Sequence, residues 1–168
     1  MQTIYSDIRK SGISLIGGLP WGTYICQLYQ TEHDLFDILI PYFKAGLENN
    51  EFCLWMVSGP LNVEAARKAM RKAVPHFQKY VRKKQIEISS GSLWDADDGN
   101  PGKAVISRLD QPISAGFDGL RFAANVLSET GAGITLPWWG KAGTFDKHNI
   151  IGVFAYPRDK FNAIGLME

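Results

Sequence analysis

Cysteine is scarce in this chain, which has only Cys26 and Cys53 among its 168 residues. Two cysteines are too few for the disulfide framework of a small secreted domain. Both lie in apolar runs, where a free thiol commonly behaves as a small buried hydrophobic side chain. We therefore expect two buried, inert thiols in a cytoplasmic protein.

Long hydrophobic runs are also lacking. The longest uncharged stretch, between Lys10 and Glu32, is interrupted by four glycines and a proline, so it predicts neither a membrane span nor a cleavable signal. The 18 basic and 17 acidic residues nearly balance, which argues against a protein that binds nucleic acid or membranes through its overall charge. With 45% hydrophobic residues the chain can bury one core, and we expect a polar leader over 1–20 and a single domain over 21–168.

The sequence has no phosphate-binding loop. Such a loop needs a glycine, four further residues, and then Gly-Lys followed by Ser or Thr, which together hold the phosphates and Mg²⁺. The nearest segment has Asp97 in place of the first glycine and Ala104 in place of the hydroxyl residue. This argues against nucleotide hydrolysis and leaves a degenerate nucleotide-binding protein as an alternative.

Catalytic and metal-binding patterns are missing as well. The two cysteines and three histidines match no zinc-ligand spacing, and no spacing pairs Cys26 with a histidine base. Asp95, Asp97 and Asp98 lack the ligand spacing and closing glutamate of a calcium loop and predict a turn. We therefore expect a protein that is not an enzyme and that binds neither a cofactor nor a metal.

Alternating strand and helix signals run along the chain. Thr31 and Asp34 form a capping-box pattern at the start of the first helix, which Pro41 is expected to bend or break. Asn62 is a candidate cap for the second helix. The stretch 128–149 is rich in glycine and carries Trp138 and Trp139, which predicts a loop or lid. The expected strands are 22–29, 53–57, 85–89, 119–125 and 150–156, and the expected helices are 31–47, 62–75 with a weak continuation over 77–81, and 103–114.

Strands separated by helices of crossover length predict an α/β fold. We expect a mainly parallel central sheet of about five strands with helices on both faces. In such sheets ligands bind beyond the carboxyl ends of the strands. The residues there are mostly aromatic or neutral hydrogen-bonding groups, which suit a small, weakly polar organic ligand better than a phosphate.

The predicted ligand site combines aromatic contacts with two polar anchors. Arg121 and Asn125 are four residues apart on one predicted strand and so share a face, where they would orient a polar end of the ligand. The candidate ligand-binding residues are Tyr24, Cys26, Tyr29, Trp55, Ser58, Trp94, Arg121, Asn125 and Tyr156.

A basic stretch offers a second hypothesis. Residues 64–84 contain eight basic side chains and a single acidic one, Glu64. Such a stretch is most often a solvated helix face, and the alternative is a protein-interaction or DNA-associated module that acts through this basic helix. No recognised nucleic-acid-binding motif accompanies it, so a nucleic acid is the less expected partner.

Several segments carry a resemblance to a known family. They are LPWGTYICQLYQTE over 19–32, PYFKAGLENNEFCLW over 41–55, GFDGLR over 116–121 with Asn125 after it, and AYP over 155–157. These segments closely resemble the MEDS domain, the DcmR-type sensory domain of methanogen and methylotroph signalling proteins. The resemblance spans about residues 17–160 and is strongest before residue 90.

The resemblance implies a non-enzymatic sensor of small hydrocarbon derivatives, such as one-carbon compounds. It also implies a three-layer α/β fold similar to the RecA and KaiC type, without the phosphate loop. In the family the domain usually accompanies a histidine kinase or a DNA-binding module, so a kinase or transcriptional regulator is the implied partner. The identity of the ligand and the oligomeric state, a homodimer included, stay open.

The chain departs from the family at several places, so it resembles a divergent and C-terminally shortened member. Tyr24 stands where the family commonly has His, and Phe154 stands where it has a Cys near the final strand. The stretch 128–149 replaces an acidic, aromatic helix, and the chain stops at Glu168, before the usual terminal helix. Without the His and the Cys, metal-assisted ligand binding is not expected.

Overall fold

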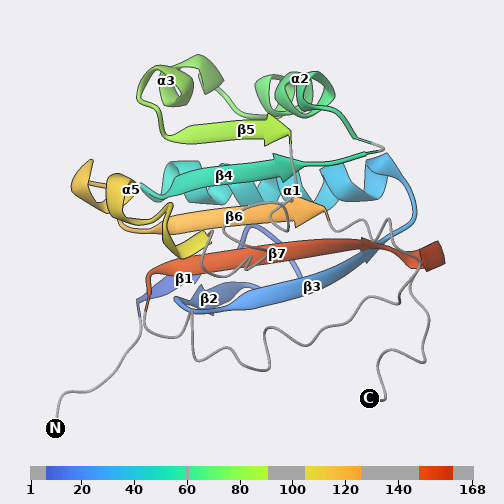
Figure 1. Cartoon of the computed structure of the whole chain (residues 1–168), viewed down its shortest axis with the longest axis horizontal. Coiled ribbons are helices and arrows are strands. Elements are labelled where there is room, and N and C mark those ends of the chain that lie inside the picture. Colours follow the sequence, from blue (N-terminus) through green and yellow to red (C-terminus); the bar gives the residue numbers. More distant parts are fainter. Residues whose placement is uncertain (1–6, 60, 91–104, 126–147, 161–168) are drawn as a thin grey trace, which may run out of the picture.

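The computed structural model describes residues 7–59, 61–90, 105–125 and 148–160. Its centre is a sheet of five parallel strands in the order β3-β7-β6-β4-β5. All five arrows point the same way in Figure 1, so the carboxyl ends of the strands share one edge of the sheet. The predicted α/β fold with a parallel sheet is confirmed. The strands are β3 (Tyr24–Tyr29), β4 (Phe52–Val57), β5 (Ile86–Ser90), β6 (Leu120–Asn125) and β7 (Ile150–Pro157), each within two residues of its predicted bounds.

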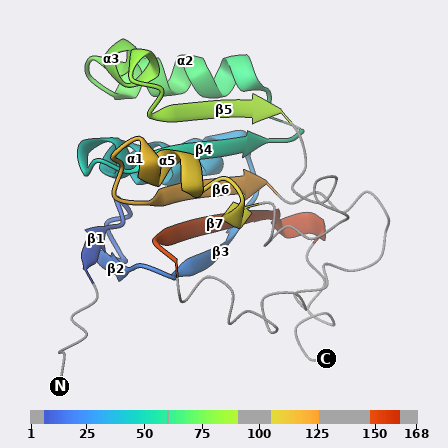
Figure 2. The same cartoon turned by 60° about the vertical axis from the view of Figure 1, so that its left-hand side comes forward.

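Helices cover both faces of the sheet, and each face has its own core. On one face, α1 (Glu32–Glu48) and α2 (Val63–Ala73) pack over apolar side chains of the strands. Every second residue of a strand points to this face. The opposite face carries a second cluster, which includes Leu54, Phe122 and Phe154 together with Val105 and Leu109 from the segment before α5 (Asp110–Ser114). Figure 2 shows α2 and α3 (Phe77–Arg82) beside β5, at one end of the sheet.

The first helix begins where its capping signal predicts. The Thr31 hydroxyl accepts a hydrogen bond from the Asp34 amide at 3.2 Å, and the Asp34 carboxylate accepts from the amides of Gln30 and Thr31 at 2.9 Å each. Pro41 lies inside the helix, which runs on to Glu48, so the predicted break is wrong. The loss of one backbone hydrogen bond is offset by burial of the side chains around it, Leu39, Tyr42 and Phe43 among them.

The second helical region also follows its local signals. The Asn62 side chain accepts a hydrogen bond from the Ala65 amide at 2.8 Å, as the cap prediction requires. After α2 the chain turns at His76, whose φ is +56°, and then continues as α3. The predicted helix over 103–114 is only partly described, and within it α5 is a short helix that contains Pro112.

The segment predicted as a leader belongs to the folded domain from residue 7 onward. Strands β1 (Ile8–Lys10) and β2 (Gly18–Pro20) pair antiparallel, and Leu19 is buried in the core of the α1 face. Gly12 lies so close to α1 that a Cβ there would stand 2.1 Å from the Pro41 carbonyl oxygen, and its φ of +79° also favours glycine. The described part of residues 1–20 therefore contributes to the core beside the parallel sheet.

A buried ion pair ties this hairpin to the sheet. Arg121 of β6 and Glu51, just before β4, are fully buried and pair through the Arg121 Nε and one Glu51 carboxylate oxygen. The other guanidinium N–H groups donate to the second Glu51 oxygen at 3.2 Å and to the carbonyls of Ser11, Tyr42 and Lys10 at 2.8–3.0 Å. All five donors of the guanidinium are thus used. Gly46 makes room for this group, because a Cβ there would stand 2.6 Å from Arg121 Cδ.

In the part of the chain that the structure describes, no helix combines the length and the apolar character that crossing a bilayer requires.

Replacement of Arg121 tests the ion pair. Arg121→Met leaves the buried Glu51 with Arg9 as its remaining ion-pair partner, at 2.9 Å, and removes the donor of the Ser11, Tyr42 and Lys10 carbonyls. We therefore expect the free energy of unfolding to fall by about 3 kcal/mol, measured by urea denaturation. The matched control is Arg108→Met, because Arg108 pairs with Glu87 on the surface, with both side chains nearly half exposed. Its loss should cost about 1 kcal/mol or less. An equal effect of the two substitutions would contradict this account of Arg121.

The capping box predicts a pH dependence. The amide hydrogen bonds from Gln30 and Thr31 lower the pKa of Asp34 below its ordinary value. A carboxyl group whose pKa falls on folding stabilises the folded state above its unfolded pKa and loses that effect as the pH drops through the folded one. The stability gap between wild type and Asp34→Asn should therefore be full at pH 7 and shrink below about pH 4. A gap that stays constant in urea titrations at pH 7 and pH 3 would show that the carboxylate charge plays no part.

Candidate functional site

The direction of chain connections reverses between β4 and β6. After β4 the chain moves outward to β5, whereas after β6 it moves the other way to β7, so these two neighbours form the topological switch point of the sheet. In open parallel sheets, ligands bind at the carboxyl ends of the strands around such a point. The Ser58 hydroxyl, just after β4, donates to the Asn125 carbonyl oxygen at 3.0 Å and joins the two strand ends.

Unpartnered polar groups gather on the α1 face toward this edge. Among the buried side chains that the structure describes, the Tyr29 hydroxyl, the Trp55 Nε1 and both amide atoms of Asn125 lack a hydrogen-bond partner. These residues are exposed by only 4%, 0% and 7%, respectively. A buried polar atom without a partner destabilises a fold by about 1–3 kcal/mol, so three such residues together call for an explanation.

The strand register shows how these three side chains are arranged. Asn125 pairs with Ala155 of β7, and Tyr29 on the far side of β7 pairs with Pro157, two residues farther toward the carboxyl edge. Trp55 on the other neighbour of β6 pairs with Ala123 and so lies one same-face position before Asn125. Asn125 on β6 therefore lies between Trp55 on β4 and Tyr29 on β3. The small side chain of Ala155, on β7, lies between Asn125 and β3.

Apolar rings from α1 surround the Trp55 end of the group. Trp55 stacks on Phe43, with ring centroids 5.2 Å apart and an interplanar angle of 28°. Phe36 meets the same indole edge-on at 6.4 Å. These contacts hold the indole in place and leave its N–H without an acceptor.

The electrostatic surroundings keep Tyr29 neutral. Burial raises the pKa of its hydroxyl, and the negative charge of Asp159 raises it further. Asp159 belongs to the short 3₁₀ helix η3 (Arg158–Lys160) that follows β7. The hydroxyl therefore keeps its proton near neutral pH and can donate as well as accept a hydrogen bond.

The predicted site residues fall on both faces of the sheet. Tyr29, Trp55 and Asn125 lie on the α1 face, whereas Tyr24 and Tyr156 pack in the cluster on the opposite face. Cys26 follows Tyr24 by two residues along β3, so it shares the face of Tyr24, opposite α1. The sheet itself separates the two groups. Trp94 lies outside the described residues.

Cys26 corrects one expectation. It was predicted to be buried, but the structure leaves it exposed, whereas Cys53 is buried as predicted. The physical reason is that β3 is the edge strand of the described sheet, and its neighbouring residue on the same face, Leu28, is exposed as well.

Arg121 shares the face of Asn125 but not its surroundings. The two residues are at opposite ends of β6, about 13 Å apart at the usual rise of a strand. All the guanidinium donors are taken by Glu51 and backbone carbonyls, so the structure does not bring Arg121 and Asn125 together as joint anchors.

The arrangement is suited to binding a small neutral molecule. The Asn125 amide offers a donor and an acceptor, Tyr29 offers either, and Trp55 offers a donor. Within the described ranges, no three His, Cys, Asp or Glu side chains are grouped as a metal site would require. Sequence reasoning missed Ala155 and Asp159, which strand alternation and the position directly after the last strand could have indicated.

Comparison with known proteins gives one match. The family model described as MEDS, the methanogen/methylotroph DcmR sensory domain, matches residues 24–168. Comparison with curated proteins finds none that matches the chain. The matched residues include every strand of the parallel sheet and the three unpartnered polar groups.

Two tyrosines give a matched test of the unpartnered groups. Tyr29→Phe removes a buried hydroxyl without a partner, so the free energy of unfolding should rise by about 1 kcal/mol. The Tyr42 hydroxyl lies 3.0 Å from the carbonyl oxygens of both Phe122 and Ile151. Tyr42→Phe should therefore lower the free energy of unfolding by about 1–3 kcal/mol. Urea denaturation measures both, and a loss of stability in Tyr29→Phe would mean that this hydroxyl has a partner.

Proposed function

Because the chain belongs to the family of MEDS sensory domains, we propose that it senses a small hydrocarbon derivative bound at the carboxyl edge of its sheet. The ligand is a one-carbon or similarly small organic compound with one polar group. Asn125 and Tyr29 bind the polar group, and the rings of Trp55 and its α1 neighbours contact the apolar part. The signal passes to a kinase or transcriptional partner.

The observation that carries this proposal is the set of buried, unpartnered polar atoms at the switch point. A ligand that supplies the missing hydrogen bonds removes an existing penalty, so the gain from binding is larger than for groups that were already satisfied. The same reasoning explains selectivity, because a purely apolar molecule of the same size leaves the Asn125 amide unsatisfied.

A binding role, rather than catalysis, is supported by the kinds of group present. The three groups are an amide, a phenol and an indole, and burial together with Asp159 keeps the phenol protonated. None of them is a strong base or nucleophile in this state. The match to a sensory family points the same way.

A thermal-shift panel tests the proposal. The purified chain is heated with methanol, methylamine, methanethiol, a halomethane, or ATP with Mg²⁺. A ligand of the native state at 100 times its Kd adds about 2.7 kcal/mol. For a chain of this length that should raise the Tm by about 5–10 °C. We expect a shift with one class of small organic compound.

The assignment of the site is tested with the same assay. Asn125→Leu should abolish the ligand-induced shift while leaving the protein folded, because leucine has a similar shape and no amide. The matched control is Tyr24→Phe, on the opposite face of the sheet, which should keep the full shift. A shift that persists in Asn125→Leu removes the ligand from this site. The proposed function is overturned if the Tm shifts with ATP and Mg²⁺ but with no organic compound, or if none of the compounds shifts the Tm.

A further inference from the structure

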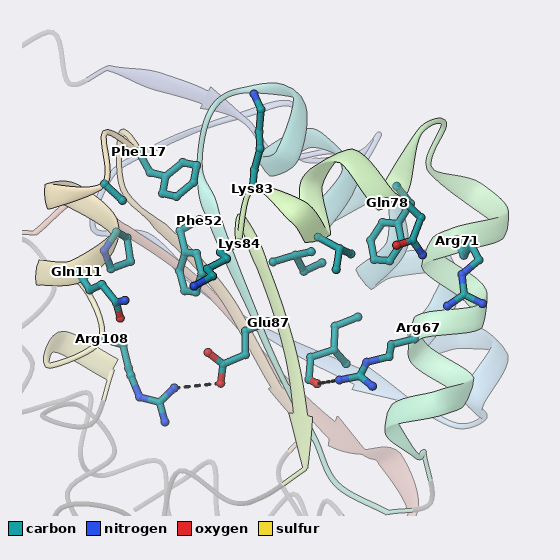
Figure 3. A pocket seen from close by; sticks show the side chains of 16 residues that line it. Phe52, Arg67, Arg71, Gln78, Lys83, Lys84, Glu87, Arg108, Gln111 and Phe117 are labelled. Carbon is teal, nitrogen blue, oxygen red and sulfur yellow. Dashed lines mark hydrogen bonds and ion pairs between the residues drawn. The ribbon is translucent and has the colours of Figure 1, made fainter.

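The outer edge of the sheet at β5 lies in an open groove. The groove has a volume of about 890 Å³ and is lined from both faces, by α2 and α3 on one side and by α5 on the other. Figure 3 shows β5 running through its middle, with Arg67 and Arg71 on one side and Arg108 and Gln111 on the other. This groove shares no residue with the proposed ligand site, although β4 contributes Phe52 to the groove and Trp55 to the ligand site.

The backbone of β5 presents hydrogen-bonding groups to this groove. The Cys53 amide of β4 donates to the Gln85 carbonyl at 2.8 Å, so this carbonyl points toward β4. Because backbone groups alternate along a strand, those of Ile86 and Ile88 point away from β4, into the groove. No described strand pairs with β5 on that side. The Arg67 guanidinium donates to the Ile88 carbonyl at 3.2 Å and covers part of the edge.

The charge of the groove is strongly one-sided. Among the described residues that line it, the one acidic residue is Glu87, which pairs with Arg108 at 3.3 Å. Apolar side chains such as Phe52, Phe77 and Phe117 form part of the lining between the charges. The cationic lining residues are Arg67, Arg71, Lys83, Lys84 and Arg108.

We propose that this groove binds an extended acidic segment of a partner protein, which adds as a further strand beside β5. The unpaired Ile86 backbone supplies main-chain hydrogen bonds, the usual basis of strand addition. Alternate side chains of an added strand point to opposite faces, so every second residue meets Arg67 and Arg71 on α2. A carboxylate at such a position is a better acceptor for Arg67 than the Ile88 carbonyl, because the hydrogen bond is then charge-assisted from both sides.

A protein segment fits this groove better than a nucleic acid. Positive charge would attract either partner, but the edge of β5 presents main-chain donors and acceptors at the spacing of a strand, which an extended peptide can match and a nucleic acid cannot. The proposal does not depend on the ligand site, because none of the groove residues belongs to the group around Asn125.

Peptide binding tests the proposal by fluorescence anisotropy. The probe is a labelled ten-residue peptide of alternating glutamate and valine, compared with one of alternating lysine and valine and with a single-stranded ten-nucleotide DNA. Arg67→Gln/Arg71→Gln should weaken binding of the acidic peptide about tenfold. The matched control is Lys68→Gln/Lys72→Gln, which removes the same charge from exposed positions of α2 outside the groove and should leave the affinity within about twofold.

The strand-addition step has its own readout. Ile86→Pro removes an N–H that faces away from β4 and should abolish binding, with circular dichroism as the check on folding. In the wild type, hydrogen exchange at the Ile86 and Ile88 amides should slow when the acidic peptide binds. The proposal is overturned by an acidic peptide that does not bind, by DNA that binds more tightly, by equal losses in the two double variants, or by unchanged exchange at both amides. Both double variants keep the small-molecule thermal shift if the ligand site is as proposed, so the two proposals fail separately.

Discussion

The buried pair of Arg121 and Glu51 is the constraint on which the rest of the domain depends. It joins the amino-terminal hairpin, α1, the start of β4 and β6 at one point. A buried pair of this kind adds little stability over apolar packing, but it heavily penalises any arrangement that leaves one charge alone. The pair therefore fixes the register of these segments, and Gly46 keeps the necessary space open.

The two ends of the sheet differ in how their polar groups are satisfied. At the amino end the guanidinium of Arg121 uses every donor, whereas toward the carboxyl end Tyr29, Trp55 and Asn125 leave theirs unused. The amino end holds the strands together through Arg121, and the unsatisfied end is where we propose that a small molecule binds. A sensor needs both, because a ligand can shift only an equilibrium that it affects differently in two states.

Local sequence signals were enough for the five parallel strands and the helix caps, whereas the amino-terminal hairpin and the contacts between elements depend on long-range geometry. The caps at Thr31 and Asn62 and the apolar runs of the strands depend on neighbours within a few residues, so the sequence located them well. The role of Arg121 depends on Glu51, 70 positions away, and no local pattern reveals it. Exposure of Cys26 follows from strand order, which the spacing of strands along a chain does not specify. The sequence could have predicted that the candidate site is divided between two faces, because side chains alternate along a strand and Tyr24 and Tyr29 are an odd number of residues apart.

The place of β7 between β3 and β6 has a consequence for how the domain assembles during synthesis. β3 is the first of the five parallel strands to be made, yet among the described strands its partner is β7, the last, more than 120 residues later. Until β7 leaves the ribosome, β3 lacks this partner, and contacts over such a separation form slowly. Tyr29 and Asn125 lie on the two strands that β7 joins. The proposed ligand site is therefore completed only when β7 joins the sheet, and unfinished chains do not yet have it.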